Sequence, residues 1–280
     1  MTEAKARMLS IEITSQCTSR CIMCPHDVLD RKNKHMPLND ILSIIDSAYD
    51  IGIREIHPHL FGEPTMHPRY AELLYTVRDK YPDIKIVAYT NGYGLHNDKI
   101  NEVILNTVDR IVISIDGATD NTMKKIRPGL DSIKIREGVR KLHENRNKNN
   151  KNKPTVTIRM TKMPENIHEV NIYKDKWKLY CDNIMMTYLQ NFHGFKELPS
   201  PIRNNLPCDR IFYAVVVTVN KNVVLCCDDY KEEVILGNLD NNFLKNIWYG
   251  EKAEQIRKLH IDKNISLIPM CSKCTYLGYL

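Results

Sequence analysis

The sequence predicts an α/β protein, a partial (β/α)6 TIM-like barrel followed by a small C-terminal domain. Two observations support this prediction. From residue 8 to about residue 191, short β-rich runs alternate with amphipathic helical patterns, which is typical of βα units around a parallel sheet. Three prolines, Pro199, Pro201 and Pro207, then mark a connector. We therefore expect one domain over residues 1–200 and a second over residues 201–280.

Six segments are expected to form the strands, because each is short, rich in β-branched residues and bounded by polar or turn residues. They span residues 8–14, 53–60, 84–90, 110–116, 155–161 and 184–190. Helical patterns lie between them, over residues 38–52, 69–82, 97–108, 132–145 and 166–180. Right-handed crossovers between parallel neighbours curl such units into a partial barrel, whose ligands gather at the carboxyl ends of the strands.

The C-terminal part has a different pattern. Residues 214–220 and 222–226 are rich in valine and predict a β-hairpin. Residues 243–259 predict one amphipathic helix after the hairpin. The second domain is therefore expected to consist of a hairpin and a helix.

Composition narrows the classes of protein. The chain has 280 residues, and 42% of them are hydrophobic, which suits a globular protein. It has no run of about 18 apolar residues and no apolar signal-peptide segment, so we expect a cytoplasmic protein without a membrane partner. Much of the net charge of +6 lies in residues 146–153, which contain no aromatic residue for base stacking. This favours a solvated loop over a nucleic-acid site.

Three cysteines form a C-x3-C-x2-C motif directly after the first predicted strand: Cys17, Cys21 and Cys24. In a reducing compartment cysteines gathered in this way point to metal ligation or redox chemistry rather than to disulfides. A structural zinc ion needs four ligands. A cubane of four irons takes one thiolate per iron, so three cysteines leave one iron open to a substrate or cofactor.

The motif and its position resemble the radical S-adenosylmethionine (SAM) superfamily. The segment FGEP (Phe61 to Pro64) is similar to the family's Gly-Gly-Glu-Pro segment, with Phe in place of the first Gly. SIDG (Ser114 to Gly117) is similar to the segment that contacts ribose and carboxylate, and IRPG (Ile126 to Gly129) to the arginine turn after it. The resemblance implies SAM-binding roles for Met23, Gly62, Glu63, Pro64, Asn91, Ser114, Asp116, Arg127 and Arg159.

The resemblance also implies a reaction. The three cysteines hold a [4Fe-4S] cluster whose open iron binds SAM, and one electron from the reduced cluster cleaves SAM to a 5′-deoxyadenosyl radical. That radical removes a hydrogen atom from the substrate. A flavodoxin or a ferredoxin is the expected electron donor.

Four further cysteines lie in the C-terminal part: Cys208, Cys226, Cys271 and Cys274. Their order around a hairpin and a helix resembles the auxiliary iron–sulfur module called twitch, a shortened form of SPASM, and implies a second [4Fe-4S] cluster. Cys227 is the alternative to Cys226 as a ligand. A zinc site is the competing interpretation, because zinc ribbons share the C-x2-C spacing.

A fully ligated auxiliary cluster can accept the electron that a substrate radical must lose when an alcohol is oxidised. This role determines the reaction that we expect. We expect dehydrogenation of a secondary alcohol on a sugar-like or cyclitol small molecule. The alternative is a peptide-modifying enzyme, an epimerase or a crosslink former, which acts on a ribosomally made precursor peptide. A non-catalytic zinc-binding or RNA-binding protein is the third interpretation.

Four residues are candidates for catalysis. Asp228 and Asp229 follow an auxiliary ligand and are either a base for the substrate proton or a solvated turn. Glu12 lies on the first strand and is either a site residue or part of a structural ion pair. Tyr188 ends the sixth strand, where it packs against adenine or the core.

Two histidines and two cysteines have rival interpretations. His57 and His59 share one face of the second strand and are more commonly satisfied core histidines than site residues. Cys181 and Cys227 are expected to be free thiols, and Cys181 to be a buried small hydrophobe. A hydrogen-atom donor is the alternative interpretation, which an epimerase would require.

Overall fold

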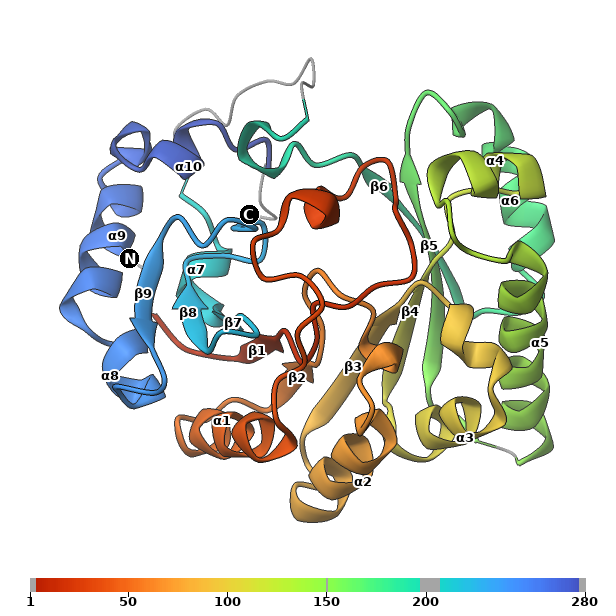
Figure 1. Cartoon of the computed structure of the whole chain (residues 1–280), viewed down its shortest axis with the longest axis horizontal. Helices are drawn as coiled ribbons and strands as arrows, with labels where there is room; N and C mark the ends of the chain where they lie inside the picture. Colours follow the sequence, from red (N-terminus) through yellow and green to blue (C-terminus); the bar gives the residue numbers. More distant parts are fainter. Residues whose placement is uncertain (1–3, 150, 197–206, 277–280) are drawn as a thin grey trace.

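The computed structural model describes residues 4–149, 151–196 and 207–276, and a nine-stranded open sheet runs through them (Figure 1). Its strand order is β6-β5-β4-β3-β2-β1-β7-β8-β9. The six predicted strands are present and pair in parallel, so the partial barrel is confirmed. Their bounds are β1 Met8–Ile11, β2 Glu55–His57, β3 Lys85–Thr90, β4 Arg110–Ser114, β5 Thr155–Lys162 and β6 Asn183–Tyr188.

The first two strands are shorter than predicted, for local reasons. Ile13 N donates to the carbonyl oxygen of Ile11, so the chain turns after Ile11 although the β-rich sequence pattern continues to residue 14. Pro58 has no N–H to give to a ladder, and it ends β2. The chain is thereby released from the sheet early, which leaves residues after Ile11 and His57 available to shape a site.

Helices cover the outer face of the six-stranded part: α1 Leu38–Asp50, α2 Tyr70–Lys80, α3 Asp98–Thr107, α5 Ser132–Lys148 and α6 Val170–Trp177. The apolar stripe of α1, including Ile41 and Ile45, packs with Leu9 and Ile11 of β1 in the main core. Asn97 and Asp131 cap α3 and α5 through their side chains. A short helix that the pattern did not predict, α4 Asp120–Ile126, follows β4.

The C-terminal part extends the same sheet. The predicted hairpin consists of β7 Ala214–Val217 and β8 Asn222–Val224, and β7 pairs in parallel with β1. An additional strand, β9 Ile235–Asn238, follows, and the predicted single helix is two helices, α8 Leu244–Trp248 and α9 Glu251–Ile261. A Cβ on Gly250 would lie 2.4 Å from the Asn246 carbonyl oxygen, so this glycine sits at the break. The expected domain boundary at residue 200 lies outside the described residues.

Figure 1 shows the long loop between β1 and α1 (red) lying between β5 and β6 on one side and the C-terminal strands with α10, Pro269–Ser272, on the other. This loop carries the first cysteine motif, and α10 carries part of the second. Within the described residues, no helix combines the length and the apolar character that crossing a membrane requires.

Candidate functional site: two cysteine centres

The loop with Cys17, Cys21 and Cys24 is held in place by the turn after α4. Arg20 N donates to Pro128 O and Ile22 N donates to Ile126 O, and the N–O distance is 3.0 Å in both. Gly129 of the same turn has φ +91°, and a Cβ there would lie 2.5 Å from Thr18 O. The IRPG turn therefore shapes the cysteine loop through its backbone.

Two of the three thiols lie in a desolvated environment. Burial raises the pKa of Cys17 to about 11 and that of Cys24 to about 12. The guanidinium of Arg127 opposes both shifts, and its Nη1 lies 3.5 Å from Cys21 Sγ. Thiols of this kind give up their protons to a bound soft metal, which the nearby cation favours. The donor set therefore fits an iron–sulfur cluster with three thiolates.

Arg127 and Asp116, both predicted to contact the cofactor, bind each other. Arg127 Nη2 lies 2.6 Å from Asp116 Oδ2 in a buried ion pair, and Asp116 Oδ1 accepts from Thr161 N over 2.7 Å. Their polar groups are thereby committed to each other, to β5 and to the cysteine loop. This pair positions the cysteine loop, and the SAM contact that the resemblance implies for these two residues stays a prediction.

The FGEP segment joins the ends of β1, β2 and β3. Glu63 is buried, and its carboxylate accepts from Thr65 Oγ1, Thr90 Oγ1 and Asn91 N over 2.7 to 2.8 Å. Burial raises the pKa of this carboxyl group. The Glu63 side chain therefore fixes the segment, and the SAM-binding role that the resemblance implies for it stays a prediction.

Gly62 and Pro64 shape the FGEP segment on either side of Glu63. A Cβ on Gly62 would lie 2.1 Å from Thr14 O, so only glycine fits at this approach to the end of β1. Pro64 begins a 3-10 turn, η2 Pro64–Met66. We therefore expect Gly62 and Pro64 to contact SAM through the backbone of the segment.

Two buried donors, one directly after β3 and one within β5 beside the end of β4, lack partners within the described part of the chain. They are Asn91 Nδ2 and Arg159 Nε. Arg159 donates from Nη2 to Ser114 Oγ over 2.9 Å, and it has no ion pair with any described residue. A cation and an amide buried in this way need an anionic or hydroxyl-bearing ligand. Asn91, Ser114 and Arg159 thus fit the carboxylate and ribose of SAM.

A small apolar cluster lies at the cysteine loop. Met23 is buried with Ile126 and Met163, and Cys21 and Leu189 pack against them. This placement agrees with the apolar contact expected of Met23.

The two histidines of the second strand segment differ. His57 Nε2 lies 2.7 Å from Glu55 Oε1, so it is satisfied. His59 stacks on Tyr89 with ring centroids 4.5 Å apart, and its Nδ1 has no partner among the described residues. Burial, reinforced by His57 and Arg159, lowers the pKa of His59 to about 3. The structure therefore supports the core interpretation for His57 alone.

For three of the four catalytic candidates the structure favours the structural interpretation. Glu12 forms a buried ion pair with Arg31, with Oε2 2.6 Å from Nε, so the ion-pair interpretation holds. Asp229 accepts from the backbone N–H groups of Glu233 and Val234 and closes a turn. Tyr188 is 74% exposed, so it does not pack in the core.

The four C-terminal cysteines Cys208, Cys226, Cys271 and Cys274 line one cavity, together with His193 and the fourth catalytic candidate, Asp228. They come from the residues before α7, Arg210–Tyr213, from the end of β8 and from α10. Cys227 does not line the cavity, and its Sγ accepts from Arg210 Nη1 over 3.3 Å. The geometry therefore favours Cys226 over Cys227 as the ligand, and the cavity fits an auxiliary iron–sulfur cluster.

His193 and Arg210 are site residues that the sequence patterns missed. His193 Nε2 lies 3.8 Å from Cys226 Sγ, and Arg210 pairs with Asp228 over 2.9 Å. Neither residue belongs to a motif, and both reach the cavity only through the tertiary fold. A lone histidine in a short FHG turn gives no local signal that would have found it.

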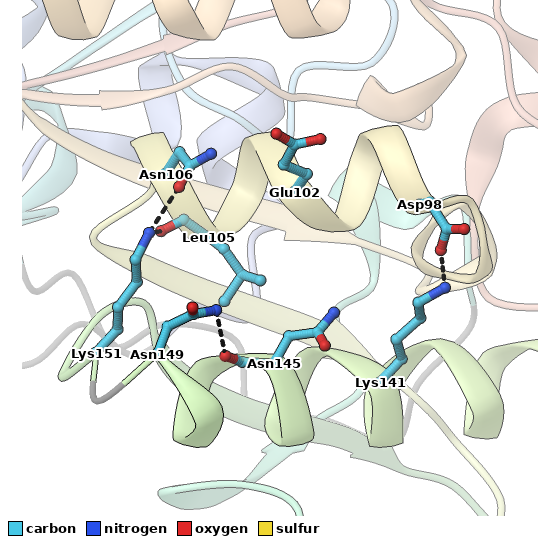
Figure 2. Close-up of a pocket in the computed structure, with 8 residues that line it drawn as sticks. All are labelled: Asp98, Glu102, Leu105, Asn106, Lys141, Asn145, Asn149 and Lys151. Atoms are coloured by element: carbon cyan, nitrogen blue, oxygen red, sulfur yellow. Dashed lines mark hydrogen bonds and ion pairs between the residues drawn. The ribbon is translucent and has the colours of Figure 1, made fainter.

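A separate cavity lies between α3 and α5 (Figure 2). Lys141 pairs with Asp98 across it, and Lys151 donates to Asn106 Oδ1 over 2.6 Å. No residue predicted for the site lines this cavity, which lies on the outer helical layer. We assign this cavity no role in the chemistry.

Residues 11–175 match the family model of the radical SAM superfamily. The chain belongs to this superfamily. Residues 208–275 match the SPASM iron–sulfur cluster-binding domain, so the iron–sulfur interpretation replaces the zinc one for the C-terminal cysteines. The protein is thus a radical SAM enzyme whose cofactors are SAM, a [4Fe-4S] cluster and an additional iron–sulfur cluster, as predicted.

The relatives agree with this assignment. The SAM-dependent 2-deoxy-scyllo-inosamine dehydrogenase of Niallia circulans is 22% identical over 276 residues, covering 95% of this chain and 92% of the relative. A GTP 3′,8-cyclase of Clostridium perfringens is 29% identical over 121 residues, which cover 42% of this chain and 37% of the cyclase. The first match spans both cysteine centres, and the second is confined to a part of each chain.

Solved structures share the fold. BtrN in complex with AdoMet and 2-DOIA has a TM-score of 0.64 at 16% identity, over 98% of this chain and 95% of BtrN. SuiB of Streptococcus suis bound to the precursor peptide SuiA has a TM-score of 0.71 at 15% identity, over 91% of this chain and 67% of SuiB. The same architecture therefore occurs in a protein solved with a small molecule and in one solved with a peptide.

Proposed function

We propose that this radical SAM enzyme dehydrogenates a secondary alcohol on a sugar-like or cyclitol small molecule, with the auxiliary cluster accepting one electron. The observation that carries the proposal is the convergence of Cys208, Cys226, Cys271 and Cys274 on one cavity. Four thiolates supply one ligand for each iron of a cubane. The auxiliary site then has no iron left to bind a substrate, and electron transfer is the role that remains for it.

SAM bound at the first cluster supplies a 5′-deoxyadenosyl radical that removes the hydrogen atom from the carbinol carbon. Oxidation to the ketone then removes the hydroxyl proton and one further electron, so the two hydrogens and two electrons of the alcohol are accounted for. Arg159, Ser114 and Asn91 orient the cofactor through their donors at the strand ends. Water is excluded by the apolar groups packed around Met23.

The proton needs an acceptor near the auxiliary centre, and Asp228 is the carboxylate there. It lines the cavity, and Arg210 Nη1 donates to its Oδ2 over 2.9 Å. Of the four catalytic candidates, it is the one that shares a cavity with the auxiliary cysteines. We propose that Asp228 takes the hydroxyl proton while the paired arginine holds it in place.

The near full-length similarity to a dehydrogenase supports this reaction over peptide modification. The likeness to SuiB rests on the fold alone, at 15% identity. A small molecule is therefore the proposed substrate, and a precursor peptide is the alternative.

We also propose an electron donor and a compartment. The donor is an acidic flavodoxin or ferredoxin, because exposed Arg20, Lys124 and Lys125 lie on the cysteine loop and on α4. The cytoplasm is the proposed location, since thiolate-held clusters of this kind suit a reducing compartment.

The test uses anaerobically reconstituted enzyme, SAM and dithionite with a panel of cyclitols and amino sugars that begins with 2-deoxy-scyllo-inosamine. We expect one substrate to give a ketone and 5′-deoxyadenosine in equal amounts, with deuterium moving from the carbinol carbon into 5′-deoxyadenosine. The Cys271→Ala/Cys274→Ala variant should still form deuterated 5′-deoxyadenosine and yield little ketone. Turnover of a peptide library, with none of any alcohol, would establish the alternative instead.

A further inference from the structure

His193 brings a nitrogen donor to the auxiliary cavity from the barrel side. Its Nε2 lies 3.8 Å from Cys226 Sγ, and its Nδ1 lies 2.8 Å from the carbonyl oxygen of Met270. One of its nitrogens, Cys226 Sγ and a carboxylate oxygen of Asp228 lie within 4.8 Å of one another. The four cysteines and His193 therefore provide five donors, one more than the irons of a cubane.

The hydrogen bond to Met270 determines which nitrogen of the His193 ring carries the hydrogen. A carbonyl oxygen only accepts, so Nδ1 carries the hydrogen in this contact. The neutral ring then directs its lone pair from Nε2 toward Cys226. Histidines that bind metals commonly donate their other N–H to a carbonyl oxygen in this way, which fixes the tautomer.

The backbone that carries His193 is strained and firmly held. Phe192 and His193 have φ of 44° and 56°, in the left-handed region that such residues disfavour. Such backbone conformations persist only where the surrounding structure imposes them. Here Asn191 Nδ2 donates to the carbonyl oxygen of Lys273 over 2.7 Å, and Asn191 N donates to Thr275 Oγ1. The turn after β6 is thus tied to the segment that carries Cys271 and Cys274.

The other polar groups at the cavity are engaged elsewhere. Asp228 is paired with Arg210 over 2.9 Å, so its negative charge is already compensated. The second histidine of the cavity, His260, accepts at Nδ1 from Cys208 N over 3.2 Å. His193 is therefore the non-cysteine side chain that the geometry aims at the Cys226 position.

We propose that His193 is an alternative ligand for the auxiliary iron that Cys226 holds. His193 Nε2 lies 3.8 Å from Cys226 Sγ, so a small movement of the side chain would bring the imidazole to the position that the thiolate occupies at the iron. Imidazole and thiolate bind a metal at similar distances, about 2.0 and 2.3 Å. Exchange of thiolate for imidazole at one iron raises the reduction potential of a cluster. The auxiliary cluster would therefore accept an electron more readily with His193 as the ligand than with Cys226. This inference goes beyond the proposed dehydrogenation and does not depend on the substrate.

The test isolates the auxiliary cluster in the full-length Cys17→Ala/Cys21→Ala/Cys24→Ala variant. Cys226→Ala is added to it, with and without His193→Ala, and iron and nitrogen hyperfine coupling are measured with ¹⁵N-labelled histidine. We expect Cys226→Ala to retain about four irons per chain and to show strong imidazole coupling. Adding His193→Ala should remove the coupling and more than half of the iron. His168→Ala, an exposed histidine on η4, Ile167–Glu169, is the matched control and should change neither readout.

A second measurement keeps Cys226 intact, in case its variant does not fold. Iron release to a chelator should be several-fold faster after His193→Ala and unchanged after His168→Ala, because the alternative ligand no longer recaptures the iron. The proposal is overturned if Cys226→Ala loses as much iron as the double variant, if retained iron shows no imidazole coupling, or if release is equally fast with and without His193.

Discussion

Arg31 and Glu12 form an ion pair that is shielded from water, with Arg31 Nε 2.6 Å from Glu12 Oε2. The pair joins the two cysteine centres. Glu12 accepts from Val219 N of the C-terminal part over 3.0 Å, and Arg31 donates to Tyr230 O over 2.6 Å. Removing one partner leaves a buried charge uncompensated. We expect Glu12→Ala to lower the free energy of unfolding by about 3–5 kcal/mol, measured by anaerobic urea denaturation.

Two controls separate this ion pair from ordinary surface charge. Glu12→Leu/Arg31→Met should recover much of the loss, because neither charge then remains buried. Glu72→Ala breaks the exposed pair with Arg69 and should leave the unfolding midpoint unchanged. If the unfolding midpoint shifts no more in Glu12→Ala than in Glu72→Ala, the buried pair does not stabilise the fold.

Phe61 stands where relatives of this family have the first glycine of the segment, and here it fills space between the centres. It is 8% exposed, and its ring centroid lies 6.1 Å from that of Phe192 and 6.5 Å from that of Tyr230. Cys24 packs against the same cluster. Phe61→Ala should cost about 3–5 kcal/mol in unfolding free energy and should speed the loss of the visible cluster absorbance in air.

Phe243→Ala is the matched control for Phe61, because Phe243 is 78% exposed. It should change neither the stability nor the bleaching rate in air. Equal bleaching of the Phe61 variant and the wild type would mean that the aromatic cluster does not shield the first cluster from oxygen.

Local patterns predict the strands and the first cysteine site well, for a physical reason. Strand and helix periods arise from which face of each element is buried, and that information lies within a few neighbouring residues. The C-x3-C-x2-C spacing is equally local. The end of a strand and a break in a helix depend on single residues such as Pro58 and Gly250. The effect of such a residue depends on the backbone around it, so these positions are predicted less well.

Contacts between distant residues are what the sequence does not reveal. The pairing of β7 with β1 and the contact of His193 with Met270 join segments far apart in the chain. The same limit applies to the buried ion pair between Asp116 and Arg127. Motif similarity identifies the segment, whereas the partner of each charged group is known only once β4, β5 and the turn are packed together.

Arg159 is expected to bind the carboxylate of SAM. Its guanidinium has one hydrogen bond, to Ser114 Oγ, and a buried Nε without a described partner. Lysine keeps the charge but loses the planar fork, so Arg159→Lys should weaken SAM binding about 10- to 100-fold, the equivalent of one lost charge-assisted hydrogen bond. Anaerobic equilibrium dialysis with SAM measures this.

Arg140→Lys, on the exposed face of α5, is the control for Arg159 and should bind SAM as the wild type does. Iron content should be unchanged in both variants. Unaltered SAM affinity in Arg159→Lys would place the carboxylate elsewhere.

His59 should make the protein less stable as the pH falls. Burial lowers its folded-state pKa to about 3, and the groups that face it are His57, Arg159 and the stacked ring of Tyr89. Its unfolded-state pKa is about 6.5, so below that pH the unfolded chain takes up a proton that the folded chain refuses. Between pH 7.5 and 5.5 the wild type should lose roughly 1 kcal/mol relative to His59→Gln, measured as unfolding free energy across that range. Parallel pH profiles for the two proteins would refute the neutral, buried state of this ring.

Cys227 is expected to be dispensable for both clusters. It does not line the auxiliary cavity, and burial raises the pKa of its thiol to about 12, with Arg210 Nη1 3.3 Å from the sulfur. Cys181 Sγ donates to Trp177 O before β6, at the opposite end of the parallel strands from the cysteine loops. A dehydrogenase needs no thiol that returns a hydrogen atom, whereas an epimerase does. Cys181→Ala/Cys227→Ala should therefore keep about eight irons per chain and full turnover, whereas Cys208→Ala should lose about half of the iron. Intact iron with abolished turnover in the double variant would favour an epimerase, because a hydrogen-atom donor would then have been removed without damage to either cluster.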